Sequence, residues 1–189
     1  METASYHKSP VQIESEADII LAAQKDLIHF ELLYNAYFER IFRFIYQRLQ
    51  SKTEAADLCS QVFMKAMLNI KKYKTKGIPF SAWLIRIAIN EMNNAFSKQT
   101  KDRTIQIESI QIESLIQESG IEGEDDKKAL LTKALTQLAD DDLLIIELRF
   151  FENNSFKEIA DILNITENNA KVKTYRILDK IKQMIVKHS

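Results

Sequence analysis

The stretch SFKEIADILNITENNAKVKTYRILDKI (residues 155–181) has the pattern of a short helix, a brief turn and a longer second helix. Ser155 and Glu158 have the spacing of a capping box, in which each side chain binds the backbone N–H of the other residue. Small and apolar side chains follow at helical spacing and predict a buried face: Ile159, Ala160 and Leu163. The stretch therefore predicts two packed helices close to the end of the chain.

The second of these helices begins with polar residues and continues with basic ones. We expect a tight turn at Asn164 and Ile165, and Thr166 has a side chain suited to cap the helix that follows. This layout is that of a helix-turn-helix, whose second helix lies in the DNA major groove. Asn can bind adenine edges, and Lys and Arg neutralise phosphates. We predict that the DNA-binding residues of this unit are Thr166, Glu167, Asn168, Asn169, Lys171, Lys173, Thr174 and Arg176.

The composition of the whole chain favours helices. Among 189 residues there are only 3 Gly and 2 Pro, whereas hydrophobic residues reach 46%. Hairpins and phosphate-binding loops need glycine at positive φ, so we expect an all-α protein. The one cysteine, Cys59, excludes a disulfide within the chain, and its place on an apolar stripe predicts a small core residue.

Several functional classes are disfavoured by what the sequence lacks. The three histidines are far apart and Cys59 stands alone, so we expect no metal site and no cofactor. No nucleophile constellation or Gly-rich phosphate loop is visible, which argues against an enzyme. The polar N-terminus does not resemble a signal peptide, and no apolar run reaches the length of a membrane span. We therefore expect a cytoplasmic protein.

Charge is partitioned along the chain although the net charge is only −1. Residues 65–103 hold nine basic side chains against two acidic ones, and residues 166–188 hold six against two. Between them, residues 104–126 hold seven acidic side chains and no basic one. We interpret this segment as part of a flexible acidic linker, either a simple spacer or one that occupies the basic faces when DNA is absent.

The linker divides the chain into two predicted domains. We expect a tail over residues 1–17, a helical domain over 18–98, the linker over 99–126 and the helix-turn-helix domain over 127–189. Within the first domain, apolar spacing from Phe30 predicts a helix over FELLYNAYFERIFRFIYQRL. Thr53 is the expected cap of the next helix, and Ser81 a possible cap of the helix FSAWLIRIAINEMNNAF.

Both halves resemble one protein family. The segment EIADILNITENNAKVKTYRILDKI is similar to region 4 of sigma factors of the extracytoplasmic-function group of the sigma-70 family. The N-terminal segments EAADLCSQVFMKAM and FSAWLIRIAINEMNNAFSK resemble region 2 of the same family. The order of the two regions and the variable linker between them also agree with the family pattern. The resemblance implies two small helical domains that bind core RNA polymerase and promoter DNA.

The resemblance also assigns roles to particular residues. Region 2 would contact core polymerase through Asp57, Leu58, Ser60, Gln61 and Met64. It would open and bind the −10 promoter element through Lys72, Tyr73, Lys74, Lys76, Arg86, Asn90, Asn93, Asn94 and Lys98. A basic loop with an aromatic side chain is also what gripping a single strand requires. Region 4 would bind the −35 element, and an anti-sigma factor is a further partner known for the family.

The chain departs from the family pattern at several positions, which keeps two other readings open. Ile89 and Ala95 stand where the family has Arg, and Asn94 stands where it has Asp. A degenerate sigma-like protein that binds a partner but not DNA would show such losses. A stand-alone helix-turn-helix regulator is the other alternative, although it would need a ligand pocket in the N-terminal half.

Overall fold

The computed structural model describes residues 10–96, 115 and 127–186. Its helical segments are α1 (Pro10–Lys25), the 3-10 turn η1 (Leu27–His29), α2 (Phe30–Leu49), α3 (Lys52–Asn69), the 3-10 turn η2 (Ile70–Lys72), α4 (Phe80–Phe96), α6 (Lys127–Thr136), α7 (Asp140–Ile146), the π-helical turn η3 (Glu147–Phe151), α8 (Phe156–Leu163) and α9 (Glu167–Val186). Every element over the described ranges is helical, which confirms the all-α prediction.

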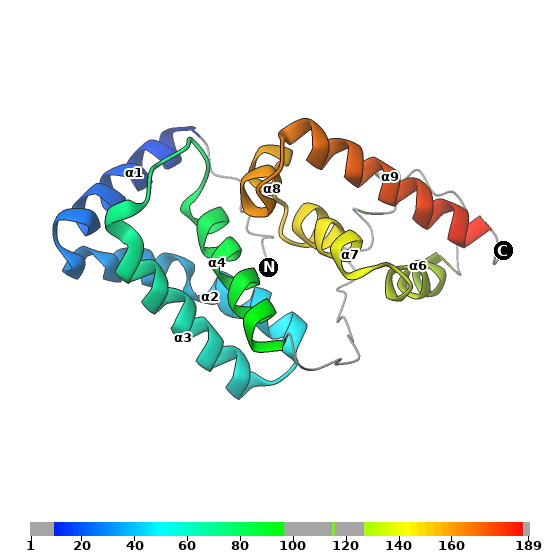
Figure 1. Ribbon diagram of the computed structural model, residues 1–189, viewed down its shortest axis with the longest axis horizontal. Coiled ribbons are helices and arrows are strands. Elements are labelled where there is room, and N and C mark those ends of the chain that lie inside the picture. The colour runs from blue at the N-terminus through cyan, green and yellow to red at the C-terminus, as the bar shows by residue number, and fades with distance from the viewer. Residues whose placement is uncertain (1–9, 97–114, 116–126, 187–189) are drawn as a thin grey trace. The chain divides into compact units, whose positions relative to one another are not determined.

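The chain divides into two compact units (Figure 1). Among the described residues, the N-terminal unit holds α1 to α4 together with the short stretch Asp161–Leu163. The C-terminal unit holds α6, α7, the rest of α8, and α9. The predicted linker lies outside the described residues except for Leu115, so its proposed occupation of the basic faces is a matter for experiment.

The N-terminal unit is a bundle in which α2, α3 and α4 pack against one another and α1 packs on α2. Its largest fully buried side chains come from α1, α2, α4 and the turn after α3: Ile20, Leu33, Ile41, Phe44, Ile45, Ile70, Phe80, Leu84 and Ile85. Cys59 is also fully buried, which confirms its predicted place in the core. This burial is the main stabilising contribution to the unit.

Helix α1 corrects the expectation of an N-terminal tail over residues 1–17. The helix begins at Pro10, and its Glu16 is buried to 4% exposure. The Glu16 carboxylate accepts hydrogen bonds from the Tyr37 hydroxyl on α2 and, at 2.9 Å, from the Phe80 backbone N–H at the start of α4. A buried carboxylate needs such donors, and two elements distant in sequence supply them. The second half of the expected tail is thus part of the bundle.

The caps of α3 and α4 differ from those predicted. Helix α3 begins at Lys52, and the Ser51 hydroxyl accepts from the Glu54 N–H at 3.3 Å, so Ser51 rather than Thr53 is the cap. Ser81 is buried, and its hydroxyl accepts a hydrogen bond from Arg40 at 2.8 Å. A neighbouring side chain that reaches the same backbone donor replaces a local cap, as Glu16 does for α4.

The capping of the helix-turn-helix agrees with its prediction. The Ser155 N–H donates to the Glu158 carboxylate at 2.6 Å, and the Glu158 N–H donates to the Ser155 hydroxyl at 3.2 Å, which completes the capping box. The Thr166 hydroxyl accepts from the Asn169 N–H at 3.2 Å. Between the helices Asn164 has φ of 54°, the left-handed conformation that Asn tolerates better than most residues.

The buried face of α8 is close to the predicted one. Ile159 and Ala160 are buried as expected, and the Ala160 carbonyl accepts the Ile165 N–H across the turn at 2.9 Å. Leu163 is only partly buried, whereas Ile162 is buried to 4% exposure.

Candidate nucleic-acid and polymerase interface

The first turns of α9 present a polar and basic face to solvent. Seven of the eight residues predicted to bind DNA in this unit are exposed: Thr166, Glu167, Asn168, Asn169, Lys171, Lys173 and Arg176. The cap at Thr166 fixes where the helix starts and therefore which side chains occupy its first turn. Amide and cationic groups gathered at the beginning of a helix are the chemistry that reads base edges and neutralises phosphates.

Thr174 is the exception among these residues, and its predicted contact with DNA is corrected. Its side chain is fully buried, and its hydroxyl donates to the Ala170 carbonyl at 2.9 Å. The buried residues of α9 recur at helical spacing: Ala170, Thr174, Ile177, Leu178, Ile181 and Ile185. Thr174 therefore holds α9 against the core of its unit and does not face solvent.

The structure adds two side chains to the exposed face of α9. Val172 is 39% exposed and Tyr175 is 43% exposed, and the Tyr175 ring lies 6.2 Å from the Phe156 ring of α8. An apolar side chain between Lys171 and Lys173 offers a contact for a thymine methyl group. The only sequence signal for Val172 is its place between Lys171 and Lys173, and apolar residues are usually assigned to the core.

The second basic surface lies around the end of α3, the loop that follows it and α4. A pocket opens there, and six of the residues predicted to bind the −10 element line it: Lys72, Tyr73, Lys74, Lys76, Arg86 and Asn90. Lys74 and Lys76 of the loop line the same pocket as Arg86 and Asn90 of α4. A pocket with cationic side chains at its edge and aromatic walls is suited to an unstacked base and its phosphates.

Aromatic side chains form one wall of this pocket. The Tyr73 ring lies 4.7 Å from the Trp83 ring and 5.2 Å from the Phe80 ring, which it meets nearly perpendicularly at 85°. Burial raises the pKa of the Tyr73 hydroxyl to about 12, with a smaller contribution in the same direction from the Glu16 carboxylate. Tyr73 therefore stays neutral at physiological pH and presents an aromatic, uncharged surface.

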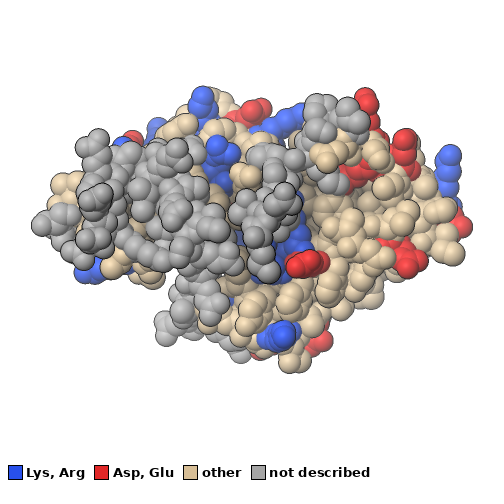
Figure 2. Space-filling view, turned by 180° about the vertical axis from the view of Figure 1, so that it is seen from behind, with Lys and Arg blue, Asp and Glu red and all other residues tan. Residues whose placement is uncertain are grey.

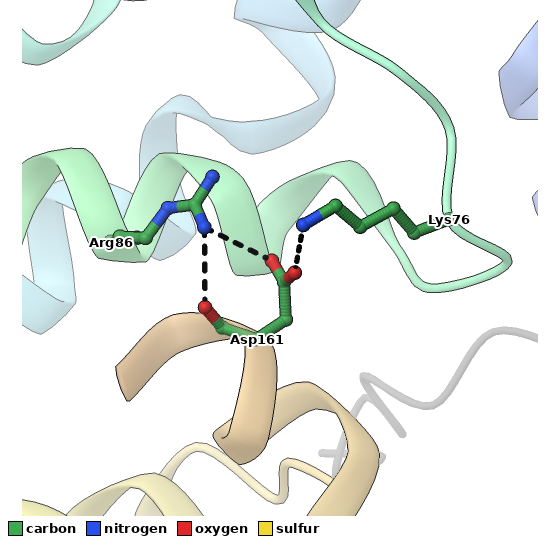
Figure 3. A network of polar contacts seen from close by, with 3 residues as sticks. All are labelled: Lys76, Arg86 and Asp161. Carbon is green, nitrogen blue, oxygen red and sulfur yellow. Dashed lines mark hydrogen bonds and ion pairs between the residues drawn. The ribbon is translucent and has the colours of Figure 1, made fainter. Parts of the chain in front are cut away.

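Two cations of the pocket converge on one acceptor in the N-terminal unit. Figure 3 shows Lys76, from the loop, and Arg86, from α4, both directed at Asp161. Lys76 pairs with the Asp161 carboxylate, and the Arg86 guanidinium lies 3.6 Å from it and donates to the Asp161 carbonyl at 3.3 Å. The two side chains can thus reach a single anionic group, which is what binding a phosphate requires.

The remaining −10 candidates do not line the pocket. Asn93 and Asn94 are exposed further along α4, and Lys98 lies outside the described residues. Lys65 lines the pocket but pairs with the buried Glu91 at 2.5 Å, which offsets its charge. The pocket thus gathers most of the set, and the two asparagines extend it along the helix.

The predicted polymerase-binding set lies on the outer face of α3, with one correction. Asp57, Ser60 and Gln61 are exposed, and Met64 is 51% exposed. Leu58 is only 5% exposed and packs in the core, so it supports the helix and is not available to a partner. Leu68, which the prediction omitted, is 69% exposed one turn beyond Met64. Two exposed apolar side chains on consecutive turns suit a protein partner.

The N-terminal unit exposes further apolar side chains at the junction of α1 and α2: Leu21, Leu27, Ile28 and Leu32. Ile28 is 69% exposed in the turn η1. Figure 2 shows, from the side opposite to Figure 1, a broad uncharged area on this unit with acidic side chains along its edge.

Two other features bear on function. Among the described residues no helix is long and apolar enough to cross a membrane, and no group of His, Cys, Asp and Glu could hold a metal ion. Burial raises the pKa of the Cys59 thiol to about 12, so the thiol is unreactive in the folded chain.

Comparison with known families gives one match in each of the two units of the chain. Two family models match the chain: "Sigma-70 region 2" over residues 33–102 and "Sigma-70, region 4" over residues 128–181. The first range contains α3, the basic loop and α4, and the second contains the helix-turn-helix. Helix α1 lies before the first matched range.

Known sigma factors are similar to this chain at low identity. The ECF RNA polymerase sigma factor BldN of Streptomyces coelicolor is 26% identical over 160 residues, which are 82% of this chain and 60% of BldN. The ECF RNA polymerase sigma factor SigM of Bacillus subtilis is 26% identical over 154 residues, 80% of this chain and 92% of SigM. The solved structure of CnrH in complex with the cytosolic domain of CnrY has a TM-score of 0.59 at 16% identity, covers 90% of this chain and 97% of CnrH, and shows a similar fold.

Proposed function

The chain belongs to the extracytoplasmic-function group of the sigma-70 family, and from this premise we propose that it binds core RNA polymerase and directs it to promoters. As a sigma factor it is a transcription initiation factor and not an enzyme. The observation that carries the proposal is that both sigma regions are present in order and that each holds a basic surface in the structure. Its place of action is the cytoplasm, where polymerase and promoters meet.

The C-terminal unit binds the −35 element as a duplex. Support comes from the exposed amides and cations in the first turns of α9, which has the place of the recognition helix in a helix-turn-helix. Asn168 and Asn169 contact base edges, and Lys171, Lys173 and Arg176 bind phosphates or guanine. Val172 adds an apolar contact in the groove.

The N-terminal unit binds the −10 element as a single strand. Support comes from the pocket between the loop and α4, where cationic side chains surround the Tyr73 and Trp83 rings. An unstacked base enters the pocket, and Lys76 and Arg86 bind an adjoining phosphate. Exposed Asn90, Asn93 and Asn94 extend the contact along α4.

Core polymerase binds the outer face of α3. Asp57, Ser60, Gln61 and Met64 form this face, and exposed Leu68 enlarges it. Met is an adaptable side chain at protein interfaces, and a leucine one turn away continues the apolar contact.

A second polypeptide partner is supported by one comparison. The solved CnrH structure contains the cytosolic domain of another protein, CnrY. We propose that an anti-sigma factor likewise binds this chain and covers exposed apolar surface of the N-terminal unit, such as Ile28 and Leu32. Co-purification of the chain with a partner whose binding excludes core polymerase is the expected result.

Transcription in vitro tests the proposed function. The purified chain is added to core polymerase on fragments of the source genome, and RNA 5′ ends are sequenced. We expect new start sites that share two upstream elements and that are lost without the chain. Start sites that share no elements would contradict the proposal. Tight sequence-specific DNA binding without core would favour a stand-alone regulator, and core binding without DNA contact would favour the degenerate reading.

A further inference from the structure

Helix α1 holds the loop that carries Tyr73 at both of its ends, although it lies before the matched region 2. The Gln24 side-chain amide donates two hydrogen bonds, to the Ile70 carbonyl at 2.9 Å and to the Tyr73 carbonyl at 2.8 Å. Both N–H groups of the amide are used in this way. At the far end of the loop, the buried Glu16 carboxylate accepts the Phe80 N–H at 2.9 Å.

These contacts fix the part of the loop that matters for the pocket. The Tyr73 N–H bonds back to the Ile70 carbonyl at 3.0 Å, so the two carbonyls bound by Gln24 bracket the single turn η2. After this turn the backbone becomes extended at Tyr73, with φ −67° and ψ 134°. That change of direction turns the Tyr73 ring toward Trp83 and Phe80 and leaves the following lysines at the mouth of the pocket.

Without Gln24 the turn η2 would be held only weakly, by its own hydrogen bonds. A single 3-10 turn has poorer hydrogen-bond geometry than an α-helix and is commonly a helix end. Carbonyl groups near a helix end can exchange protein donors for water at little cost. Gln24 itself is only partly buried, so its amide adds orientation to the loop rather than filling the core.

We propose that Gln24 is a positioning residue for single-strand recognition, acting through the Tyr73 loop. This inference rests on the proposed function of the pocket. Gln24 makes no predicted contact with DNA. It selects the loop conformation in which Tyr73 forms the aromatic wall and the loop lysines surround it. The chain thereby uses an element outside the matched family region to prepare its recognition loop before DNA arrives.

The test is a double-mutant cycle between Gln24→Met and Tyr73→Ala. Methionine keeps the length and helix propensity of glutamine but removes both donors. The probe is a −10 single strand with 2-aminopurine, bound by the chain in complex with core polymerase. For Gln24→Met we expect the strand affinity to fall about tenfold, as the loss of two hydrogen bonds in a preorganised loop suggests. Core affinity and the thermal midpoint should change little.

In the Tyr73→Ala background, Gln24→Met should have a much smaller further effect on strand affinity, because of the groups that it positions only the loop lysines remain. The matched control is Glu14→Met, an exposed position on the same helix, which should match the unchanged chain in every readout.

Three results separate the possible failures. If Tyr73→Ala weakens strand binding but Gln24→Met does not, the inference about α1 is overturned. Gln24→Met could instead lower strand affinity, core affinity and the thermal midpoint together, by the same amount in the unchanged chain and in Tyr73→Ala. That result would mean that Gln24 has only a structural role, and it would also overturn the inference. If Tyr73→Ala itself leaves strand binding unchanged, the proposed function of the pocket fails, and the inference fails with it.

Discussion

At the scale of single residues, α9 has solvent-exposed side chains that we propose to face DNA and buried or paired ones that hold the helix in its unit. Lys171 and Arg176 are exposed on α9, whereas Lys180 on the same helix pairs with Asp142 at 3.0 Å. We therefore define the proposed DNA-binding set by position along the helix as well as by charge.

This difference gives the first prediction. Lys171→Ala and Arg176→Ala should each weaken binding to a promoter duplex and lower the salt slope of that affinity by about one. Lys180→Ala is the matched control, because it removes the same charge from the far part of α9. Equal salt slopes for all three variants would contradict the assignment. Fluorescence anisotropy over a salt series, with the polymerase complex, provides the measurement.

Cys59 gives a second prediction at this scale. Its thiol has a pKa of about 12 in the folded chain against an ordinary 9.0, because burial disfavours the thiolate. The folded state therefore holds its proton more tightly, and this contribution to stability is complete below pH 9 and is lost as the pH rises toward 12. We expect no reaction with a thiol reagent near neutral pH until the chain unfolds in denaturant. Rapid labelling of the native chain would show that the core opens readily.

At the scale of elements, the local caps of α8 and α9 were predictable, whereas the cap of α3 and the contacts between distant elements were not. The capping box of α8 and the cap of α9 follow from nearest neighbours, and the structure confirms both. Helices α2 and α4 have the predicted bounds because their apolar spacing is regular. Helix α1 was missed over residues 10–17, since its buried face includes a carboxylate whose donors come from α2 and α4.

In the candidate site, too, features set by local sequence were predictable and features set by packing were not. The exposed amides and cations of α9 follow from the helix start, whereas Thr174 was misplaced although it shares the spacing of buried Ala170, Ile177 and Ile181. Its hydroxyl is satisfied inside the helix by the bond to the Ala170 carbonyl. The positions of Gln24 and Leu68 depend on packing, which no local pattern contains.

The turn between α8 and α9 gives a prediction for an element. Asn164 has φ of 54°, where a β-branched residue is strained and glycine is not. Asn164→Val should destabilise the C-terminal unit by about 1–2 kcal/mol, and Asn164→Gly should change its stability little. Loss of helix content, followed by circular dichroism in denaturant, reports both units, and the part that does not coincide with the Trp83 transition reports the C-terminal unit. Trp83, the single tryptophan, lies in the N-terminal unit, so its fluorescence transition should stay unchanged and serves as the control.

Glu16 gives the corresponding prediction for the N-terminal bundle. Glu16→Gln replaces one accepting oxygen by a donor that faces either the Tyr37 hydroxyl or the Phe80 N–H. We expect a loss of about 1–3 kcal/mol in the stability of this unit, because a buried donor is left unpaired. The Trp83 fluorescence transition should move to lower denaturant. Glu14→Gln, on the exposed side of α1, should leave it in place.

At the scale of the whole molecule, the proposed function requires both units and a partner, core RNA polymerase. The pocket of the N-terminal unit suits a single strand, and α9 suits a duplex. We propose that core polymerase contacts the exposed face of α3 and that the complex of chain and core holds the opened promoter. Strand binding and duplex binding should therefore both tighten when core is present, because the complex links the two sites.

The most direct test of the central claim is the affinity of the purified chain for core RNA polymerase. The measurement uses the chain labelled at an exposed position, with Met64→Glu as the variant and Glu14→Gln as the control. We predict a saturable complex that competes with another sigma factor for core, and a marked loss of affinity for Met64→Glu alone. Failure of the unchanged chain to bind core, under conditions where another sigma factor binds, would contradict the account.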